Sequence, residues 1–191
     1  GTVANDIWAV GGDAYSIDNS QRSLIMHYDG SSWSIVPAAK DWADQEGMYE
    51  DVFAIAPNNV WAVSSQPSHI AHWDGTAWEL VEVPVYWEGG FRVVHAFGND
   101  HIFLGGTHGQ ILHRDNGTWV QELKTEDGNF STNIFEEFWG TGPDTLYAGG
   151  NWGQVYKRNT DGSWTDLEFP TSWSEDNTVR MLWGRSASEI Y

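Results

Sequence analysis

The chain has 191 residues with 27 acidic and 9 basic side chains, a formal net charge of -18 and no cysteine. This charge repels the phosphates of nucleic acids and anionic membrane surfaces, so neither is an expected partner. The lack of cysteine excludes disulfides and thiolate metal sites. No apolar run approaches the ~20 residues of a membrane-spanning helix, so no membrane span is expected.

One short phrase opens the chain and returns along it. It reads NDIWAVGG at 5–12, VWAVSS at 60–65, IFLGG at 102–106, LYAGG at 146–150 and IY at 190–191. Its aromatic residue is Trp8, Trp61, Phe103, Tyr147 and Tyr191, and successive positions differ by 53, 42, 44 and 44 residues. Repeats of this length are typical of propellers and related arrays.

Two further phrases keep the same order around the first. One follows it, as LIMHYDGSSW at 24–33, HIAHWDGTAW at 69–78, QILHRDNGTW at 110–119 and QVYKRNTDGSW at 154–164. The other precedes it, as in DVFAIAPNN at 51–59 and RVVHAFGND at 92–100. Each phrase is short, rich in aromatic and β-branched residues, and bounded by turn-forming residues, which predicts strands.

A repeat of this kind contains four predicted strands. In the second repeat they cover 52–56, 60–65, 69–73 and 77–83, and we call them strands A to D. The dipeptides Asp29-Gly30, Asp74-Gly75 and Asp161-Gly162 are expected to form primed turns between strands C and D. The sequence therefore predicts an all-β fold, a β-propeller of four-stranded antiparallel blades with about four repeats in residues 1–191.

The 13 Trp residues find a use in this fold, because large flat side chains fill the wedge between blades. We expect core positions for the strand-D residues Trp33, Trp78, Trp119 and Trp164. The same is expected for Trp139 and Trp183 on strand A and for Trp8 and Trp61 on strand B.

Strand B occurs five times, while strands A, C and D occur four times. The last strand A, at 179–183, would close a four-bladed ring by pairing with 7–11. Alternatively, the chain is a slice of a longer array, and GTVANDIW at 1–8 echoes GRSASEIY at 184–191 because both ends are cut at the same phase. The duplicated ends favour the slice, which would make this chain part of a larger propeller.

The phrases NDIWAVGG and LIMHYDGSSW resemble the repeats of bacterial secreted propellers of the pattern N-D-V-W-A-V-G…I-x-H-[YW]-D-G-x-x-W. They are loosely similar to Asp-box, WD-repeat and tachylectin-like propellers. The resemblance covers the whole chain and implies the propeller fold and an extracellular or cell-surface, bacterial setting. An Asp-box would need Ser or Thr two residues before Asp29, Asp74 or Asp115, and none is there. Glycosidase activity is therefore not implied.

Three histidines occupy the same place in successive repeats. His27, His72 and His113 stand two residues before Asp29, Asp74 and Asp115 on strand C. Residues two apart on a strand share a face, so each His can bond its own Asp or a neighbouring blade. Equivalent positions in separate blades are spread around a ring, so we predict structural hydrogen bonds and no metal site.

No catalytic constellation is recognisable. Glu136 and Glu137 are adjacent on a predicted strand, where side chains alternate between faces, and glycoside hydrolysis needs two carboxylates flanking one bond. Nucleophile elbows, phosphate-cradling loops and metalloprotease motifs are missing from the sequence. We expect neither enzymatic activity nor a cofactor.

The loops vary most between repeats. In propellers the D-to-A and B-to-C loops share one face, which here would gather aromatic, acidic and amide side chains. Aromatic planes beside carboxylates suit sugars, and clustered loop carboxylates also admit calcium. The predicted ligand-binding residues are Asp41, Trp42, Trp87, Glu88, His108, Phe130, Asn151, Trp152, Trp173, Glu175 and Asp176.

The resulting hypothesis is a non-catalytic extracellular binding module, with carbohydrate as the first choice of ligand. The alternative is a structural or protein-interaction component of an extracellular or cell-surface assembly. The carbohydrate hypothesis places binding on the loop face, because that is where the repeats differ.

Overall fold

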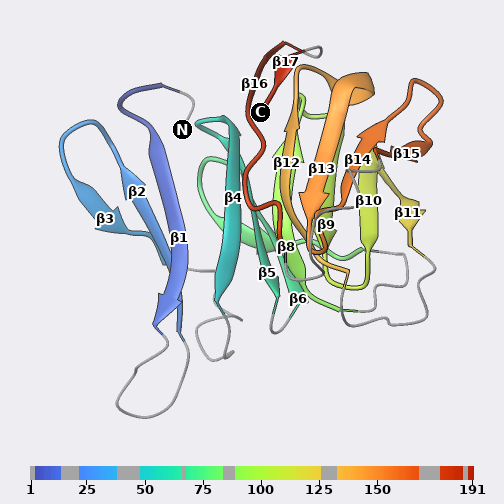
Figure 1. The fold of residues 1–191 in the computed structure, drawn as a ribbon. Helices are drawn as coiled ribbons and strands as arrows, with labels where there is room; N and C mark the ends of the chain where they lie inside the picture. The colour runs from blue at the N-terminus through green and yellow to red at the C-terminus, as the bar shows by residue number, and fades with distance from the viewer. Residues whose placement is uncertain are drawn as a thin grey trace. The chain divides into compact units, whose positions relative to one another are not determined.

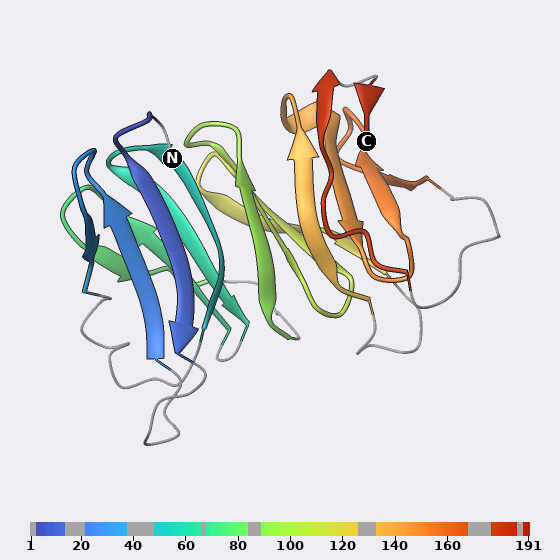
Figure 2. The same ribbon diagram turned by 60° about the vertical axis from the view of Figure 1, so that its left-hand side comes forward.

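The computed structural model describes residues 3–13, 22–37, 48–65, 68–83, 89–125, 133–167, 177–186 and 189–191. In these residues the chain forms antiparallel sheets whose strands lie in sequence order, with one short 3-10 helix (Figures 1 and 2). The strands are β1 (Ile7–Asp13), β2 (Arg22–Tyr28) and β3 (Trp33–Ile35) in the first sheet; β4 (Tyr49–Ala56), β5 (Asn59–Ser65), β6 (Ser68–Trp73) and β7 (Trp78–Leu80) in the second; β8 (Phe91–Ala96), β9 (His101–Gly106), β10 (Gln110–Asp115) and β11 (Thr118–Lys124) in the third; β12 (Phe135–Gly140), β13 (Leu146–Gly150), β14 (Val155–Arg158) and β15 (Trp164–Asp166) in the fourth; and β16 (Gly184–Ser186) with β17 (Glu189–Ile190) in the last.

The predicted four-stranded antiparallel blade is confirmed in three of these sheets. In the second repeat, strands A to C match β4, β5 and β6 closely. Strand D is shorter than predicted, because β7 ends at Leu80. The helix η1, Pro143–Thr145, lies in the A-to-B turn of the fourth sheet. Among the described residues, no helix has the length and hydrophobicity needed to cross a membrane.

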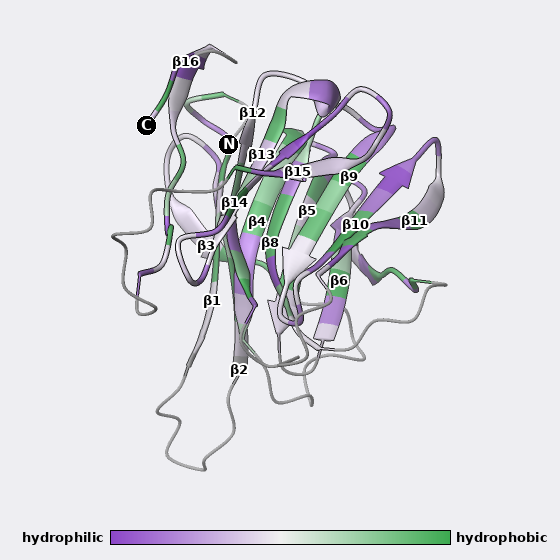
Figure 3. Cartoon of the chain, turned by 45° about the vertical axis from the view of Figure 1, so that its right-hand side comes forward, coloured by the Kyte–Doolittle hydropathy of each residue, from purple (hydrophilic) through white to green (hydrophobic). Residues whose placement is uncertain are grey.

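The chain divides into two compact units, Gly1–Pro84 and Val85–Tyr191, each with its own core. Figure 3 shows hydrophobic residues concentrated along the strands, with hydrophilic residues at the β10–β11 turn. The core of the first unit contains Trp8, Ile25, Tyr49, Val60, Ala62, Ala71 and Trp78. In the second unit one cluster contains Val93, Phe103, Ile111, Phe135, Phe138, Leu146, Ala148 and Tyr156, and a smaller one contains Tyr147, Val155 and Leu182.

The prediction that the Trp residues fill the core holds for only part of the set. Trp8, Trp61, Trp78 and Trp119 are buried. Trp164 and Trp139 are partly buried and pack against core clusters. Trp33 and Trp183 were predicted to be buried, but they are 46% and 53% exposed. Trp33 begins β3, the edge strand of the first sheet, and Trp183 stands directly before β16.

The Asp-Gly turns differ from the predicted primed turns. Gly30, Gly75 and Gly162 have φ values of 95°, 99° and 83°, but the aspartates before them do not have positive φ. Instead, each Asp side chain accepts hydrogen bonds from backbone N–H groups of its turn, such as those of Ser31 and Ser32 at Asp29. These are Asx turns, in which the carboxylate replaces a backbone acceptor. The same bonds, from Ala77 first, lower the pKa of Asp74 to about 2.

The recurring strand-C His makes a structural hydrogen bond in the first two sheets, as predicted, but to a different partner. His27 Nε2 donates to Asp6 Oδ1 at 2.7 Å, and His72 Nε2 donates to Asn59 Oδ1 at 2.9 Å. These acceptors stand two residues before the strand-B aromatic, rather than two residues after the His. The aspartates after the His are engaged in the turns.

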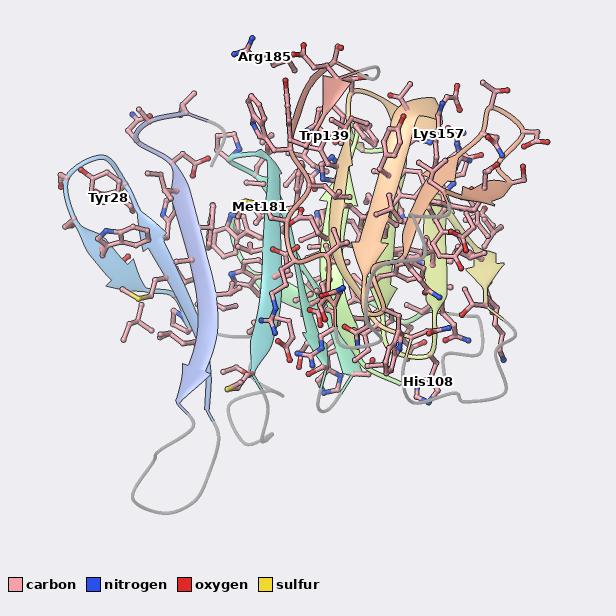
Figure 4. All side chains as sticks on the ribbon, viewed as in Figure 1. Tyr28, His108, Trp139, Lys157, Met181 and Arg185 are labelled. Atoms are coloured by element: carbon pink, nitrogen blue, oxygen red, sulfur yellow. The ribbon has the colours of Figure 1, made fainter. Side chains whose placement is uncertain are left out.

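Each of these histidines also faces the strand-B aromatic across the sheet. His27, His72 and His113 pair in register with Trp8, Trp61 and Phe103, and the ring centroids are 4.3, 4.5 and 4.1 Å apart. In the fourth sheet Lys157 takes the His position (Figure 4), and its Nζ lies 5.9 Å from the ring centre of Tyr147. In four sheets, the strand-C position opposite the strand-B aromatic therefore holds a flat or cationic side chain.

Strand A carries a β-bulge in all three four-stranded sheets. The extra residue is Glu50, Arg92 or Glu136, as the register shifts between their neighbours show. A bulge interrupts the alternation of side chains between faces. Glu136 and Glu137 therefore do not follow the regular alternation of faces that was expected of adjacent strand residues.

The two ends of the chain belong to different sheets. β1 pairs with β2 in the first sheet, and β17 pairs with β16, with Gly184 opposite Ile190. Gly140 and Leu146 pair in the same way in the fourth sheet. Gly184 and Ile190 thus repeat the A-to-B pairing of the preceding blade.

The Asn59 amide holds two side chains at once, since its Oδ1 accepts from Trp61 Nε1 at 2.9 Å and from His72 Nε2. Asn59→Ala removes both bonds and should lower the free energy of unfolding by about 1–3 kcal/mol, because two shielded donors lose their acceptor. Urea unfolding measures this. The control is Asn58→Ala, which keeps the Cβ that packs near Gly75 and should change stability by less than about 0.5 kcal/mol. Equal effects of the two variants would contradict the assignment.

Candidate functional site

Of the predicted site residues, His108, Asn151 and Trp152 lie in the described part of the chain. All three stand in B-to-C turns of the second unit, in the phrases THGQ at 107–110 and NWGQ at 151–154. The other predicted residues, which are Asp41, Trp42, Trp87, Glu88, Phe130, Trp173, Glu175 and Asp176, lie outside the described residues.

These two turns share an unusual backbone. His108 and Gly109 have φ values of 66° and 61°, and Trp152 and Gly153 have 62° and 69°. Positive φ at both central residues is what a type I′ turn requires, and its twist matches the strands it joins. Left-handed conformation costs an L-residue about 1–2 kcal/mol, so an aromatic residue is an unfavourable choice here. Figure 4 shows His108 at the end of the β9–β10 hairpin.

The turns are fixed by hydrogen bonds to the ends of the D-to-A connections. Gly109 N donates to Asn133 O at 2.8 Å, and Thr125 N donates to Gly109 O at 3.1 Å. Asn133, which is buried, also donates from Nδ2 to Thr125 Oγ1 at 2.9 Å. Thr125 and Asn133 therefore both lie beside the β9–β10 turn.

The same arrangement recurs at the other connections of this unit. Thr107 N donates to Gly90 O at 3.0 Å, and Gly90 N donates back to Thr107 Oγ1 at 2.8 Å. Gly153 N donates to Asn177 O at 2.8 Å. We call this surface the turn face, and its described residues are Gly89, Gly90, Thr107, His108, Gly109, Thr125, Asn133, Asn151, Trp152, Gly153 and Asn177.

Two glycines allow the strand-A entry to come this close to the turns. A Cβ on Gly106 would lie 2.0 Å from Gly90 O, and one on Gly150 would lie 2.0 Å from Ile134 O. These contacts explain why glycine is the last residue of strand B in the third and fourth repeats. On this rigid support Trp152 remains 41% exposed.

A second polar site lies at the other end of β10 and was missed in the sequence. Glu122 Oε1 accepts from Arg158 Nη2 and from His113 Nδ1, each at 2.7 Å, and Oε2 accepts from Arg158 Nε at 2.8 Å. Arg158 also donates to Asp144 Oδ1 at 3.1 Å. The site therefore links β11 to β14 through a bidentate ion pair.

Glu122 reaches these partners because it is the extra residue of a bulge. The β10–β11 register shifts between Ile111 and Leu112, which face Leu123 and Gln121. The signal in the sequence is a spacing: Leu123 stands four positions after Trp119, whereas Val81 stands three positions after Trp78. Such an insertion bends the strand and redirects one side chain.

The electrostatics favour an ionised Glu122. Burial opposes its charge, but hydrogen bonds from Arg158 and then His113 outweigh the burial and lower the pKa of Glu122 to about 2. The Glu122 hydrogen bonds correspondingly raise the pKa of Arg158. An open hollow of about 500 Å³ adjoins the pair, and its lining includes His113, Asp115, Thr118, Arg158 and Asp161.

Comparison with known proteins bears on the fold. No family model and no curated protein matches the chain. A structure of YCF48 bound to D1 peptide matches with a TM-score of 0.58 and 18% identity, over 79% of this chain and 50% of that chain. YCF48 from Cyanidioschyzon merolae matches with a TM-score of 0.53 and 15% identity, over 86% and 61%. The chain thus has the propeller fold of YCF48 and spans between half and two thirds of those chains.

Replacing Glu122 by Gln should alter acid stability in one pH window. The pKa of Glu122 is lowered in the folded state, so its stabilisation is complete above the unfolded pKa of about 4.3 and is lost as pH falls towards 2. Wild type should therefore lose more stability than Glu122→Gln between about pH 4.3 and 2. Urea unfolding at several pH values measures the difference, with exposed Glu79→Gln as control. Parallel pH profiles for Glu122→Gln and wild type would contradict the assignment.

Proposed function

We propose that the chain is a non-catalytic protein-interaction module that binds a polypeptide segment at the turn face. The observation that carries this proposal is Trp152, a partly exposed aromatic residue held at positive φ on a hydrogen-bonded turn. Backbone strain at such a residue persists only where the surroundings fix it, and it is concentrated at functional sites.

The physics of binding explains the value of this arrangement. Trp is enriched among the few residues that dominate the energy of protein interfaces. A side chain already fixed on a rigid turn loses little conformational freedom on binding, so more of its contact energy becomes affinity. The net charge of -18 would speed encounters with a basic segment and disfavour acidic ones.

The likeness to YCF48 supports a protein partner, since one of the matching structures has a D1 peptide bound. That peptide is bound by YCF48. The partner of this chain is defined by its chemistry alone. Carbohydrate was the first choice from the sequence, and most of the residues that suggested it lie outside the described part of the chain. The comparison favours the alternative hypothesis of a protein-interaction component.

Trp152→Asn tests the proposal with little disturbance of the backbone, because Asn tolerates left-handed conformation better than Trp does. We expect the free energy of unfolding to stay within about 1 kcal/mol of wild type. Binding to an array of short peptides of graded charge should concentrate on basic peptides. The variant should bind those peptides with a Kd about 30-fold higher, which corresponds to the loss of a typical interface hot spot of about 2 kcal/mol.

The matched control is Trp33→Thr, since Trp33 is as exposed as Trp152 but lies on strand D of another unit. It should leave peptide binding unchanged. A glycan array run in parallel separates the two ligand classes. Binding to glycans that is lost in Trp152→Asn, with no binding to peptides, would replace this proposal with the carbohydrate hypothesis.

A further inference from the structure

The third sheet departs from the repeat two residues before its strand-B aromatic, at the position that bonds the strand-C His in the first two sheets. This position holds Asp6 in the first sheet and Asn59 in the second, and both accept a hydrogen bond from the strand-C His. In the third sheet it is His101, whose Nδ1 lies 3.0 Å from Nε2 of His113. Two imidazoles therefore occupy a place that elsewhere holds one imidazole and an oxygen acceptor.

The other ring nitrogen of His113 is held by the second departure, the inserted Glu122. The Glu122 carboxylate accepts from His113 Nδ1 at 2.7 Å, and the two side chains are 9% and 3% exposed. Phe103 stacks on the His113 ring at 4.1 Å with an interplanar angle of 6°. Because Nδ1 carries the proton that Glu122 accepts, the Nε2 lone pair is directed towards His101.

We propose that His101 Nδ1, His113 Nε2 and the Asp115 carboxylate form a binding site for a divalent transition-metal ion of the Zn²⁺ class. The ligand atoms of the three side chains lie within 4.8 Å of one another. The Asp115 Oδ1 is 3.7 Å from His101 Nδ1. This site is independent of the function proposed for the turn face.

The distances suit this ion. Zn–N and Zn–O bonds of about 2.0–2.2 Å at a tetrahedral centre separate neighbouring ligand atoms by about 3.3–3.6 Å. The present separations of 3.0 and 3.7 Å lie on either side of that range. His101 and Asp115 have side chains 34% and 51% exposed, so they can adjust while His113 stays fixed. His101 would carry its proton on Nε2 when Nδ1 binds the metal.

The chemistry of the site selects the class of metal. Imidazole nitrogens suit Zn²⁺, Co²⁺, Ni²⁺ and Cu²⁺, whereas Ca²⁺ and Mg²⁺ require mostly oxygen ligands. The Glu122–His113 hydrogen bond has the carboxylate–histidine–metal arrangement that fixes the tautomer and orientation of a metal-bound His. Three protein ligands leave at least one coordination position for water or for a group from outside the chain.

No metal site is expected from the sequence, because equivalent histidines of different blades are spread around a ring. The ligands proposed here come from one blade, on β9, on β10 and at the β10–β11 turn. The position of His101 one strand away from His113 follows from the antiparallel register, in which Phe103 faces His113.

The test is calorimetric titration of ZnCl₂ into the tag-free chain after treatment with a chelator. His101→Asn is the main variant, since Asn fills this position in the second sheet and still accepts a hydrogen bond from His. We expect one site in wild type that His101→Asn weakens by more than about 100-fold. Glu122→Gln should weaken it by about 10- to 100-fold, as loss of an orienting partner does.

His72→Gln is the matched control, because His72 has the same strand-C position without a second imidazole opposite it. It should retain the site, and Co²⁺ added to wild type should give visible absorption bands that His101→Asn abolishes. Thermal unfolding without metal checks that the variants are folded. Equal Zn²⁺ affinities of folded His101→Asn and wild type would overturn the proposal, as would a site lost in His72→Gln but kept in His101→Asn.

Discussion

The packing of a strand-B aromatic against the side chain opposite it in strand C recurs in the first four sheets. In Trp8–His27, Trp61–His72 and Phe103–His113 the His ring lies against the aromatic ring at interplanar angles of 28°, 34° and 6°. In each sheet, Nε2 of this His lies within hydrogen-bond distance of the residue two positions before the aromatic. The place of the His ring is thus the same in the three blades, while the residue that contacts its Nε2 differs from blade to blade. Asp6 makes an ion pair possible, Asn59 a neutral bond, and His101 a pair of imidazoles.

The strand order, the four-stranded blade and the confinement of three predicted site residues to B-to-C turns followed from the sequence. They depend on local rules, since strand propensity, Gly-rich turns and repeat spacing act over a few residues. Hydrogen-bond partners that are far apart in the sequence could not be predicted by these rules. The acceptor of His27 is Asp6, 21 residues away along the chain, whereas Asp29 was nearer in sequence and chemically equivalent. Pairing register decided between them, and register is set by the whole sheet.

Bulges explain the differences from prediction at Glu136 and Glu122. A bulge adds one residue to a strand without changing its composition, so alternation rules continue to look valid when they have failed. Glu136 and Glu122 both stand at such insertions, and the second of them produces the ion pair with Arg158. Comparison of spacings between repeats reveals the Glu122 insertion, because the other repeats supply the reference length. An isolated strand would contain no such signal.

The two candidate sites of the second unit use opposite ends of the same hairpin. His101 begins β9, and His108 lies in the turn after β9 ends at Gly106. At about 3.3 Å per residue, roughly 20 Å of strand separates them. Between them lie Phe103 and Leu104, which are fully buried. The effects of changes at sites this far apart normally add independently. Substitutions in the β9–β10 turn can therefore alter binding there without altering the His101–His113 pair.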